Sequence, residues 1–268
     1  MPAPIVIADS ITRVGSEAAG AVVVNASHGG TYAAHLAAKL QAAAAIFNDA
    51  AVGCDRAGIA GLDYLQEYGI GAAAVGHDTA RIGDGADMMA HGIITHANVA
   101  ATALGVCPGQ SCCAAAALLQ QSKPTRRAPP EAREAAFLLI TEAPQVWALD
   151  SASLVLPEHR HAIVLTGSHG GLLGNRPETA LKYDVLGVLY NDAGIGKDAA
   201  GISRLPALDA RGIAAATVSA ASARIGDARS TYEDGAISRV NARAAALGLS
   251  EGVTARDFVT ALRRALAE

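Results

Sequence analysis

One Gly-rich stretch occurs twice in this sequence, and the repetition constrains the fold more than any other feature. Residues 191–202 read NDAGIGKDAAGI, and residues 48–59 read NDAAVGCDRAGI. Each stretch follows a short apolar run and precedes an amphipathic helical pattern, the strand–loop–helix order that is typical of α/β proteins. At one mismatch, Cys54 of the first copy stands where the second copy has Lys197.

The repeat extends along most of the chain. Further blocks recur in the same order with one short insertion: DS at Asp9 and Asp150, SHGG at Ser27 and Ser168, and ARIGD at Ala80 and Ala223. We therefore expect an internally duplicated α/β protein with mostly parallel sheets, whose two similar halves are related by a pseudo-two-fold axis. The expected organisation is a first repeat over 1–121, a linker and bridging helix over 122–141, and a second repeat over 142–268. The two repeats would form one compact molecule with a shared cleft.

The composition limits the classes of function. With 268 residues, 51% apolar and 4% aromatic, the chain can bury a large core but offers few side chains for stacking on bases. A net charge of −4 provides no basic surface for nucleic acid. No apolar run approaches the roughly 20 residues of a membrane span, and the four cysteines lack zinc-type spacing. We expect a cytoplasmic protein that binds neither nucleic acid nor membrane.

The repeated polar residues follow predicted strands. In a parallel sheet the carboxyl ends of the strands meet at one edge, and ligands bind beyond that edge. Asn, Asp, Ser and Gly are also turn formers and helix caps, so a structural role is the alternative at each position. Residues 131–140 and 235–247 have patterns that predict helices.

Ser168 and His169 are the first candidates for chemistry. A serine on a sharp strand-to-helix turn can be a nucleophile, and the N–H groups of Gly170 and Gly171 could bind an anion or an oxyanion. The sequence does not fit G-x-S-x-G, because Thr166 stands two residues before Ser168. A turn capped by the serine hydroxyl is the alternative.

Lys197 is one of only four lysines and lies close to a predicted helix N-terminus. The positive helix end would lower the lysine pKa and favour a neutral amine. Such an amine can act as a base, form a Schiff base or bind an anion. A solvated surface lysine is the alternative, and Cys54 in the matching place is interpreted as a buried remnant.

Two Arg–Asp pairs allow two interpretations. Arg224 with Asp227, and Arg81 with Asp84, could form structural ion pairs, or the arginines could bind a substrate carboxylate. Residues 230–235, STYEDG, contain more hydrogen-bonding side chains than the matching DMMAHG. The second half is therefore predicted to hold the active site.

The sequence predicts no metal and no cofactor. The loop with Gly194 and Gly196 lacks the third glycine of the dinucleotide fingerprint. A metal site would need the two halves to face each other, and no established metal-binding spacing supports it. The residues of such a site would be His28, His169, Asp49 and Asp192.

Together these features predict a cofactor-independent enzyme that acts on a small, polar, carboxylate-bearing metabolite. The leading hypothesis is a hydrolase of an amide or similar C–N bond, with Ser168 as nucleophile and Lys197 as its base. The predicted catalytic residues are Ser168, Lys197, His169 and Asp198. The predicted substrate-binding residues are Gly170, Gly171, Asn191, Asp192, Gly194, Gly196, Arg224, Asp227, Tyr232, Ser27, His28, Asp49 and Arg81.

Three alternatives stay open. The first is an isomerase or lyase that uses Lys197 for proton transfer. The second is a metal-assisted hydrolase that uses His28 and His169, and the third is a non-catalytic small-molecule-binding protein. A homo-oligomer is compatible with each of them.

Overall fold

The computed structural model describes residues 1–125 and 127–267. The protein is an α/β protein with two mixed sheets, both mostly parallel. The chain divides into two compact units. Unit 1 comprises Met1–Val52, Arg56–Arg133 and Gly196–Ala200, whereas unit 2 comprises Gly53–Asp55, Glu134–Ile195 and the chain from Gly201 onward. Each unit therefore contains one short segment from the other half of the sequence.

The sheet of unit 1 has five strands in the order β1-β2-β3-β4-β5. The first four are parallel, and β5 runs antiparallel to β4. The inner strands are short apolar runs because both faces of the sheet are covered. The strands are β1 (Ile5–Ala8), β2 (Val22–His28), β3 (Ala44–Asn48), β4 (Gly71–Val75) and β5 (Ile94–Ala97).

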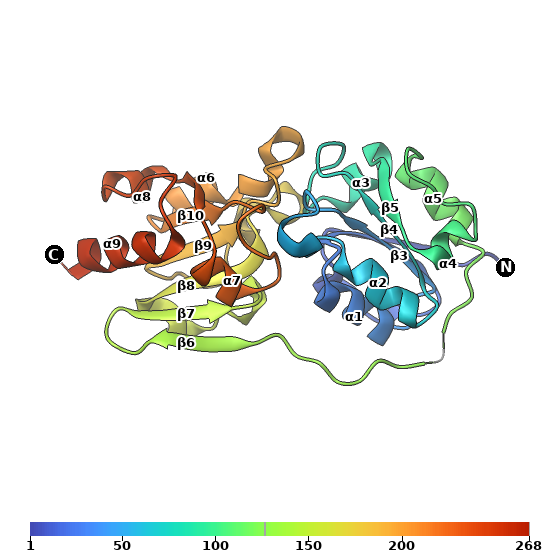
Figure 1. The fold of residues 1–268 in the computed structure, drawn as a ribbon, viewed down its shortest axis with the longest axis horizontal. Helices are drawn as coiled ribbons and strands as arrows, with labels where there is room; N and C mark the ends of the chain where they lie inside the picture. The colour runs from blue at the N-terminus through green and yellow to red at the C-terminus, as the bar shows by residue number, and fades with distance from the viewer. Residues whose placement is uncertain (126, 268) are drawn as a thin grey trace. The chain divides into compact units, whose positions relative to one another are not determined.

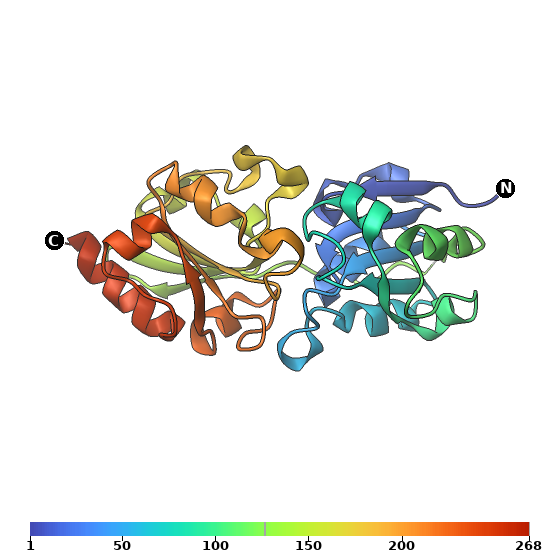
Figure 2. The same cartoon turned by 90° about the horizontal axis from the view of Figure 1, so that it is seen from above.

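Helices cover both faces of this sheet (Figures 1 and 2). On one face, α1 (Thr31–Lys39) and α2 (Ala60–Glu67) pack against Val23 and Phe47 of the sheet. The other face packs against α3 (Gly85–His91), α4 (Val99–Thr102) and α5 (Cys112–Leu119). Alternate residues of each strand point to opposite cores, which gives a three-layer α/β/α unit.

The sheet of unit 2 has six strands in the order β11-β10-β9-β8-β7-β6. Strands β7 to β10 are parallel, and the two outer strands run antiparallel to their neighbours. The strands are β6 (Ala136–Ile140), β7 (Gln145–Leu149), β8 (Ala162–His169), β9 (Gly187–Asn191), β10 (Ala214–Val218) and β11 (Ile237–Val240).

Unit 2 is also covered on both faces (Figure 1). Residues of α6 (Arg204–Asp209) pack with Val188 and Tyr190 on one face. The other core contains residues of α8 (Ala242–Ala246) and α9 (Ala255–Ala267), and α7 (Ala228–Glu233) also contacts β8. Short 3-10 segments occupy Ile11–Arg13, Ser16–Ala18, Cys54–Arg56, Ala152–Leu154, Pro157–His161, Leu173–Asn175, Pro177–Thr179 and Lys197–Ile202.

Two expected helices are wrong. The helix expected over 131–140 is replaced by β6, which pairs antiparallel with β7. The helix expected over 235–247 is divided into β11 and the short α8. In both places hydrogen bonding to a neighbouring strand overrides a weak helical pattern in the sequence, as tertiary context often does. Residues 122–125 and 127–130 of the expected linker form neither helix nor strand, and Arg126 lies outside the described residues.

Across residues 1–125 and 127–267, no helix combines the length and apolar character needed to cross a membrane.

Candidate active site in unit 1

A loop from the second half of the chain, Gly196–Ala200, belongs to unit 1. Its backbone is held by the segment that follows β4, because the N–H of Lys197 donates to the carbonyl oxygen of His77 at 2.8 Å. Gly196 has a φ of 67°, and a Cβ there would come within 2.6 Å of the same carbonyl oxygen. Glycine is therefore required for this close approach.

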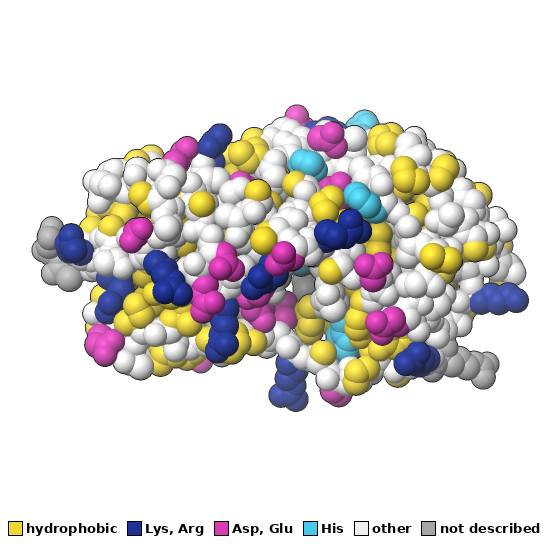
Figure 3. Space-filling model, in the orientation of Figure 1, with side chains coloured by type: hydrophobic (Ala, Val, Ile, Leu, Met, Phe, Trp, Pro, Cys, Tyr) yellow, Lys and Arg dark blue, Asp and Glu magenta, His cyan; other side chains and the backbone are white. Residues whose placement is uncertain are grey.

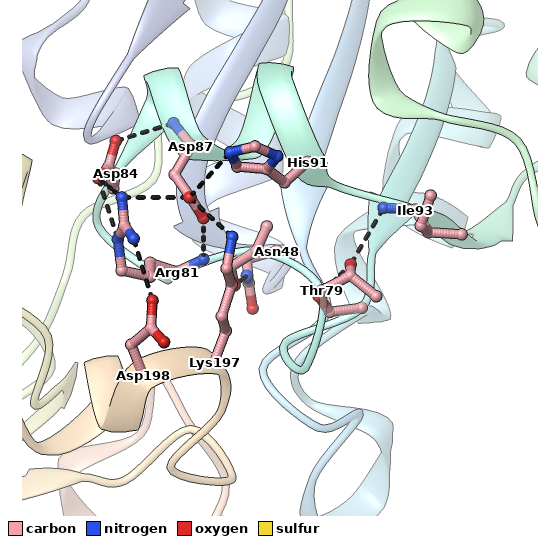
Figure 4. A network of polar contacts seen from close by, with 11 residues as sticks. Asn48, Thr79, Arg81, Asp84, Asp87, His91, Ile93, Lys197 and Asp198 are labelled. Carbon is pink, nitrogen blue, oxygen red and sulfur yellow. Dashed lines mark hydrogen bonds and ion pairs between the residues drawn. The ribbon is translucent and has the colours of Figure 1, made fainter.

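The side chain of Lys197 ends at Asp87 (Figure 4). Its Nζ donates to Oδ1 of Asp87 at 2.8 Å, and the side chains are 23% and 2% exposed, respectively. The lysine is thus anchored on a buried carboxylate while part of its surface stays accessible. This ion pair is the centre of the candidate site.

The start of α3 positions Asp87. Asp84 caps the helix by accepting from the N–H of Asp87 at 2.9 Å, an arrangement that favours an acidic residue in the first turn. The N–H of Arg81 donates to Oδ2 of Asp87 at 2.8 Å, and the Arg81 guanidinium lies 3.1 Å from Oδ1. Both carboxylate oxygens of Asp87 are therefore engaged.

Arg81 connects the remaining acidic groups. Its guanidinium contacts Asp84 at 2.9 Å and Asp198 at 3.0 Å. The hydrogen bond to Asp84 is the largest cause of the raised pKa of Arg81. The side chain of Asp198, which is predicted to be catalytic, is 61% exposed. Its ion pair with Arg81 holds the loop Gly196–Ala200 against the segment before α3.

Electrostatics stabilise the ionised form of Asp87. Burial alone would raise its pKa, but the hydrogen bonds from Lys197 and the Arg81 backbone, and the charges of both cations, lower it below the ordinary value of 3.8. The sequence predicts a helix N-terminus beside Lys197, but no α-helix begins there. Asp198 and Ala199 have φ values of 53° and 55°, and the next helix, α6, begins at Arg204. A helix dipole therefore does not act on Lys197 in the expected way.

A second cluster lies beside this loop, at the ends of β3 and β4. Oδ1 of Asp49 accepts from the N–H of His77 at 2.9 Å and from its Nδ1 at 3.0 Å. Oδ2 of Asp49 accepts from the hydroxyl of Thr95 at 3.0 Å. Asp49 is buried, whereas the His77 side chain is 29% exposed. The geometry is that of an Asp–His pair with a fixed imidazole.

Unit 2 has different residues at the matching places of the repeat. Cys54, Ser230 and Ala220 stand where unit 1 has Lys197, Asp87 and His77. The hydroxyl of Ser230 accepts from the N–H of Arg224 at 3.0 Å, as Asp87 does from Arg81. This hydrogen bond to the backbone therefore recurs in unit 2, whereas the lysine–aspartate and histidine–aspartate pairs occur in unit 1.

The Ser168 block lies at the end of β8 in unit 2. The hydroxyl of Ser168 accepts from the N–H of Ala152 at 2.9 Å, and that of Ser27 accepts from Ile11 at 3.0 Å in unit 1. Ser168 thus holds the segment that follows β7, and Ser27 holds the segment that follows β1. Because Ser168 and Lys197 belong to different units, their pairing as nucleophile and base stays a prediction.

The other residues of this block are engaged within the protein. The N–H of Gly170 donates to the carbonyl oxygen of Asn191 at 2.8 Å, and that of Gly171 donates to Nδ1 of His169 at 3.1 Å. These are the two N–H groups expected to bind an oxyanion. The matching histidine, His28, accepts from Gly30 at 3.2 Å, and burial lowers its pKa to about 4.

The repeated Asn and Asp residues shape their own loops. Asn191 accepts from Ala193 and donates to Ala223, with distances of 2.9 and 3.0 Å. Oδ1 of Asp192 accepts from the N–H groups of Gly194 and Ala220, both at 2.9 Å. These bonds are structural and leave the predicted role in substrate binding untested.

The Arg224 pair is partly structural. Arg224 contacts Asp227 at 3.2 Å and Asp55 at 3.1 Å, and Asp227 caps α7. Tyr232 lies under the Arg256 guanidinium, which is 5.2 Å from the centre of the ring. Their roles in substrate binding stay predictions.

Metal ligation finds no geometric support within the described ranges. Among residues 1–125 and 127–267, no three His, Cys, Asp or Glu side chains are grouped so that they could hold a metal ion.

The face shown in Figure 3 has Lys and Arg side chains lying among Asp and Glu side chains.

Comparison of the chain with protein-family models, with curated proteins and with solved structures finds no match.

Two residues of this site, Asp87 and His77, are not among the predicted site residues. Asp87 begins the less polar of the two matching stretches, DMMAHG, and no motif singles out His77. The available signal was the position-by-position difference between the copies: an Asp, a His and a Lys replace a Ser, an Ala and a Cys.

Proposed function

We propose that the protein is a cofactor-independent enzyme that hydrolyses an amide or similar C–N bond in a small, carboxylate-bearing metabolite, with Lys197 as its central residue. The observation that carries this proposal is the ion pair between Lys197 and Asp87. It fixes the ammonium group of a partly exposed lysine side chain on a buried carboxylate. A cation held in place before the reaction is the arrangement that stabilises developing negative charge most effectively.

The roles follow from the charges. The Lys197 ammonium would stabilise the oxyanion that forms when the amide carbonyl is attacked. The Arg81 side chain is 35% exposed and contacts Asp84, Asp87 and Asp198, so its guanidinium would bind the substrate carboxylate in place of the exposed Asp198. Because Nζ of Lys197 donates to the Asp87 carboxylate, this proposal uses Lys197 as a cation and not as the base of Ser168.

A single site explains the difference between the copies better than two equivalent sites. Cys54 and Ser230 provide no charge at the places of Lys197 and Asp87. A non-catalytic protein with two pseudo-equivalent ligand sites would need the same groups in both units. We therefore assign the reaction to unit 1.

We also propose that the two halves arose by duplication. Support comes from the repeated sequence blocks and from matching hydrogen bonds. For example, Oδ1 of Asn98 accepts from the N–H of Ala72 at 2.9 Å, and Oδ1 of Asn241 accepts from the N–H of Ala215 at 3.0 Å. A cytoplasmic location is part of the same proposal, supported by four free cysteines. The pseudo-two-fold axis and a homo-oligomer stay predictions.

The test is release of ammonia or amine from a panel of small carboxylate-bearing amides and cyclic imides. The variants are Lys197→Met and, as control, Lys182→Met, which removes an exposed lysine near Tyr183 in unit 2. Loss of one oxyanion-stabilising group lowers the rate by about 100-fold or more, and the control keeps its activity. Full turnover by Lys197→Met would overturn the proposal. Proton exchange into substrate without C–N cleavage would overturn it in favour of an isomerase or lyase.

A further inference from the structure

We infer that His77 is the general base of this reaction and that Asp49 is its positioning residue. The inference rests on the proposed function and deepens it by naming the group that activates water. It is carried by the hydrogen bond of 3.0 Å between Nδ1 of His77 and Oδ1 of Asp49.

The hydrogen bond determines the tautomer of His77. An ionised carboxylate can only accept, so Nδ1 of the imidazole must be the donor. In the neutral ring the lone pair is then on Nε2. Thr95 holds the other oxygen of Asp49 at 3.0 Å, so the carboxylate is fixed from both sides. A buried carboxylate that orients a partly exposed imidazole is the arrangement found where histidine acts as a base.

The loop itself does not require the imidazole. In unit 2, Asp192 accepts from the N–H of Ala220 at 2.9 Å, as Asp49 accepts from the N–H of His77. An alanine therefore supplies the backbone bond that this loop needs. The contact between the imidazole and Asp49 is additional to that bond, and it occurs in the unit that also holds the Lys197–Asp87 pair.

His77 and Lys197 are adjacent in the fold. The N–H of Lys197 donates to the carbonyl oxygen of His77 at 2.8 Å, and Gly196 packs against the backbone of His77. The backbone segments that carry the proposed base and the proposed oxyanion-stabilising cation are thus joined directly. Both residues belong to unit 1.

The reaction balances without a cofactor. Nε2 of His77 takes one proton from water as the water oxygen forms a bond to the amide carbon, and the Lys197 ammonium stabilises the resulting oxyanion. The C–N bond then breaks, and the proton held by His77 passes to the leaving nitrogen. The products are a carboxylic acid and an amine or ammonia.

The first experiment needs no substrate. Diethyl pyrocarbonate acylates neutral imidazoles, and peptide mass spectrometry identifies the histidine that is modified. We expect His77 to be acylated in the wild-type protein, and the rate at His77 to fall about tenfold in Asp49→Ala, because the tautomer is no longer fixed. A wild-type protein in which His77 stays unmodified, or a rate unchanged in Asp49→Ala, would overturn the inference.

The second experiment uses the amide and imide panel. His77→Asn retains a side-chain N–H near the position of Nδ1 but lacks the base, and we expect its turnover to fall about 100-fold. His161→Asn, which changes an exposed histidine of unit 2, is the control. Exogenous imidazole should restore part of the activity of His77→Ala, which a purely structural histidine would not allow. Circular dichroism and thermal unfolding confirm that each variant folds.

The outcomes separate the two proposals. If Lys197→Met is inactive and His77→Asn is fully active, the proposed function stands and the general base is not His77. If both variants are fully active, the proposed function falls and the inference falls with it. If both are inactive and imidazole rescues His77→Ala, both are supported.

Discussion

Nζ of Lys197 donates a 2.8 Å hydrogen bond to Oδ1 of Asp87, although the two residues are 110 positions apart in the sequence. The pair lies within unit 1 because the loop Gly196–Ala200 packs there. A residue of the second half of the sequence thus joins a candidate site whose other groups come from the first half.

Exchanging the pair for its counterpart in unit 2 tests the energetic coupling. Lys197→Cys alone should lower the free energy of unfolding by about 2 kcal/mol, because it removes a charge-assisted hydrogen bond to a buried carboxylate. Adding Asp87→Ser reproduces Cys54 and Ser230 of unit 2 and removes the buried charge. The double variant should therefore be more stable than the sum of the two single changes predicts.

Urea unfolding of the four proteins in this cycle measures the coupling energy. Catalytic turnover should be lost in all three variants. Additive stabilities would show that Lys197 and Asp87 do not interact in solution.

Asn98 provides a second prediction, concerning the core of unit 1. Its Oδ1 accepts from Ala72 and Ala101, both at 2.9 Å, and its Nδ2 donates to the carbonyl oxygens of Leu62 and Ile70 at 3.2 and 2.9 Å. Asn98→Ala would leave these four buried backbone groups without their partner, at a cost of about 3 kcal/mol.

Thermal or urea unfolding measures this cost. Gln121→Ala, at an exposed position after α5, is the control and should change stability by less than about 0.5 kcal/mol. A similar small effect for Asn98→Ala would contradict the structural role of the amide.

The fold was predictable to the extent that it depends on local patterns. Buried parallel strands are short apolar runs, so a mostly parallel α/β protein follows from the sequence. The antiparallel strands β6 and β11 were expected as helices, because their pairing with β7 and β10 depends on residues distant in the sequence.

The candidate site was predictable only in part. Lys197 and Asp49 were selected because they lie in the repeated loops, but the partner of Lys197 is determined by the unit on which its loop packs. That packing is non-local. Ser168 had the features of a nucleophile, yet its observed hydrogen bond to the N–H of Ala152 depends on a turn that no sequence pattern marks.

Asp49 gives a prediction about acid stability. Burial would raise its pKa, but hydrogen bonds from the His77 side chain and backbone lower it below 3.8. The carboxylate therefore contributes stability that is present above about pH 3.8 and is lost as the pH falls through the lower pKa of the folded state. Asp49→Asn should cost about 2 kcal/mol at neutral pH, and this difference should shrink in acid.

The difference between wild type and Asp49→Asn is measured by urea unfolding from neutral pH to about pH 2.5. Asp63→Asn, at an exposed position on α2, should follow the wild type throughout. A constant difference between Asp49→Asn and wild type would show that the ionised carboxylate is not what stabilises the loop.

Glu134 gives a prediction of opposite sign. Burial and the neighbouring charge of Asp150 raise its pKa to about 7, although a hydrogen bond with Ser151 acts the other way. Asp150 is held in place by the backbone N–H groups of Ala135 and Ala228, at 2.9 and 3.1 Å. The folded protein therefore binds a proton at Glu134 more tightly than the unfolded chain does.

It follows that wild-type stability falls as the pH rises from about 4.5 to about 7, because folding must then accommodate a charged, partly buried Glu134. Glu134→Gln removes this cost. The variant should match the wild type near pH 4 and exceed it by roughly 2 kcal/mol at pH 8, a value reduced for partial exposure. Glu131→Gln, three residues earlier and paired with Lys39 on the surface, should show no such divergence. Parallel stability curves for Glu134→Gln and wild type over this range would mean that Glu134 is ionised in the folded protein with an ordinary pKa.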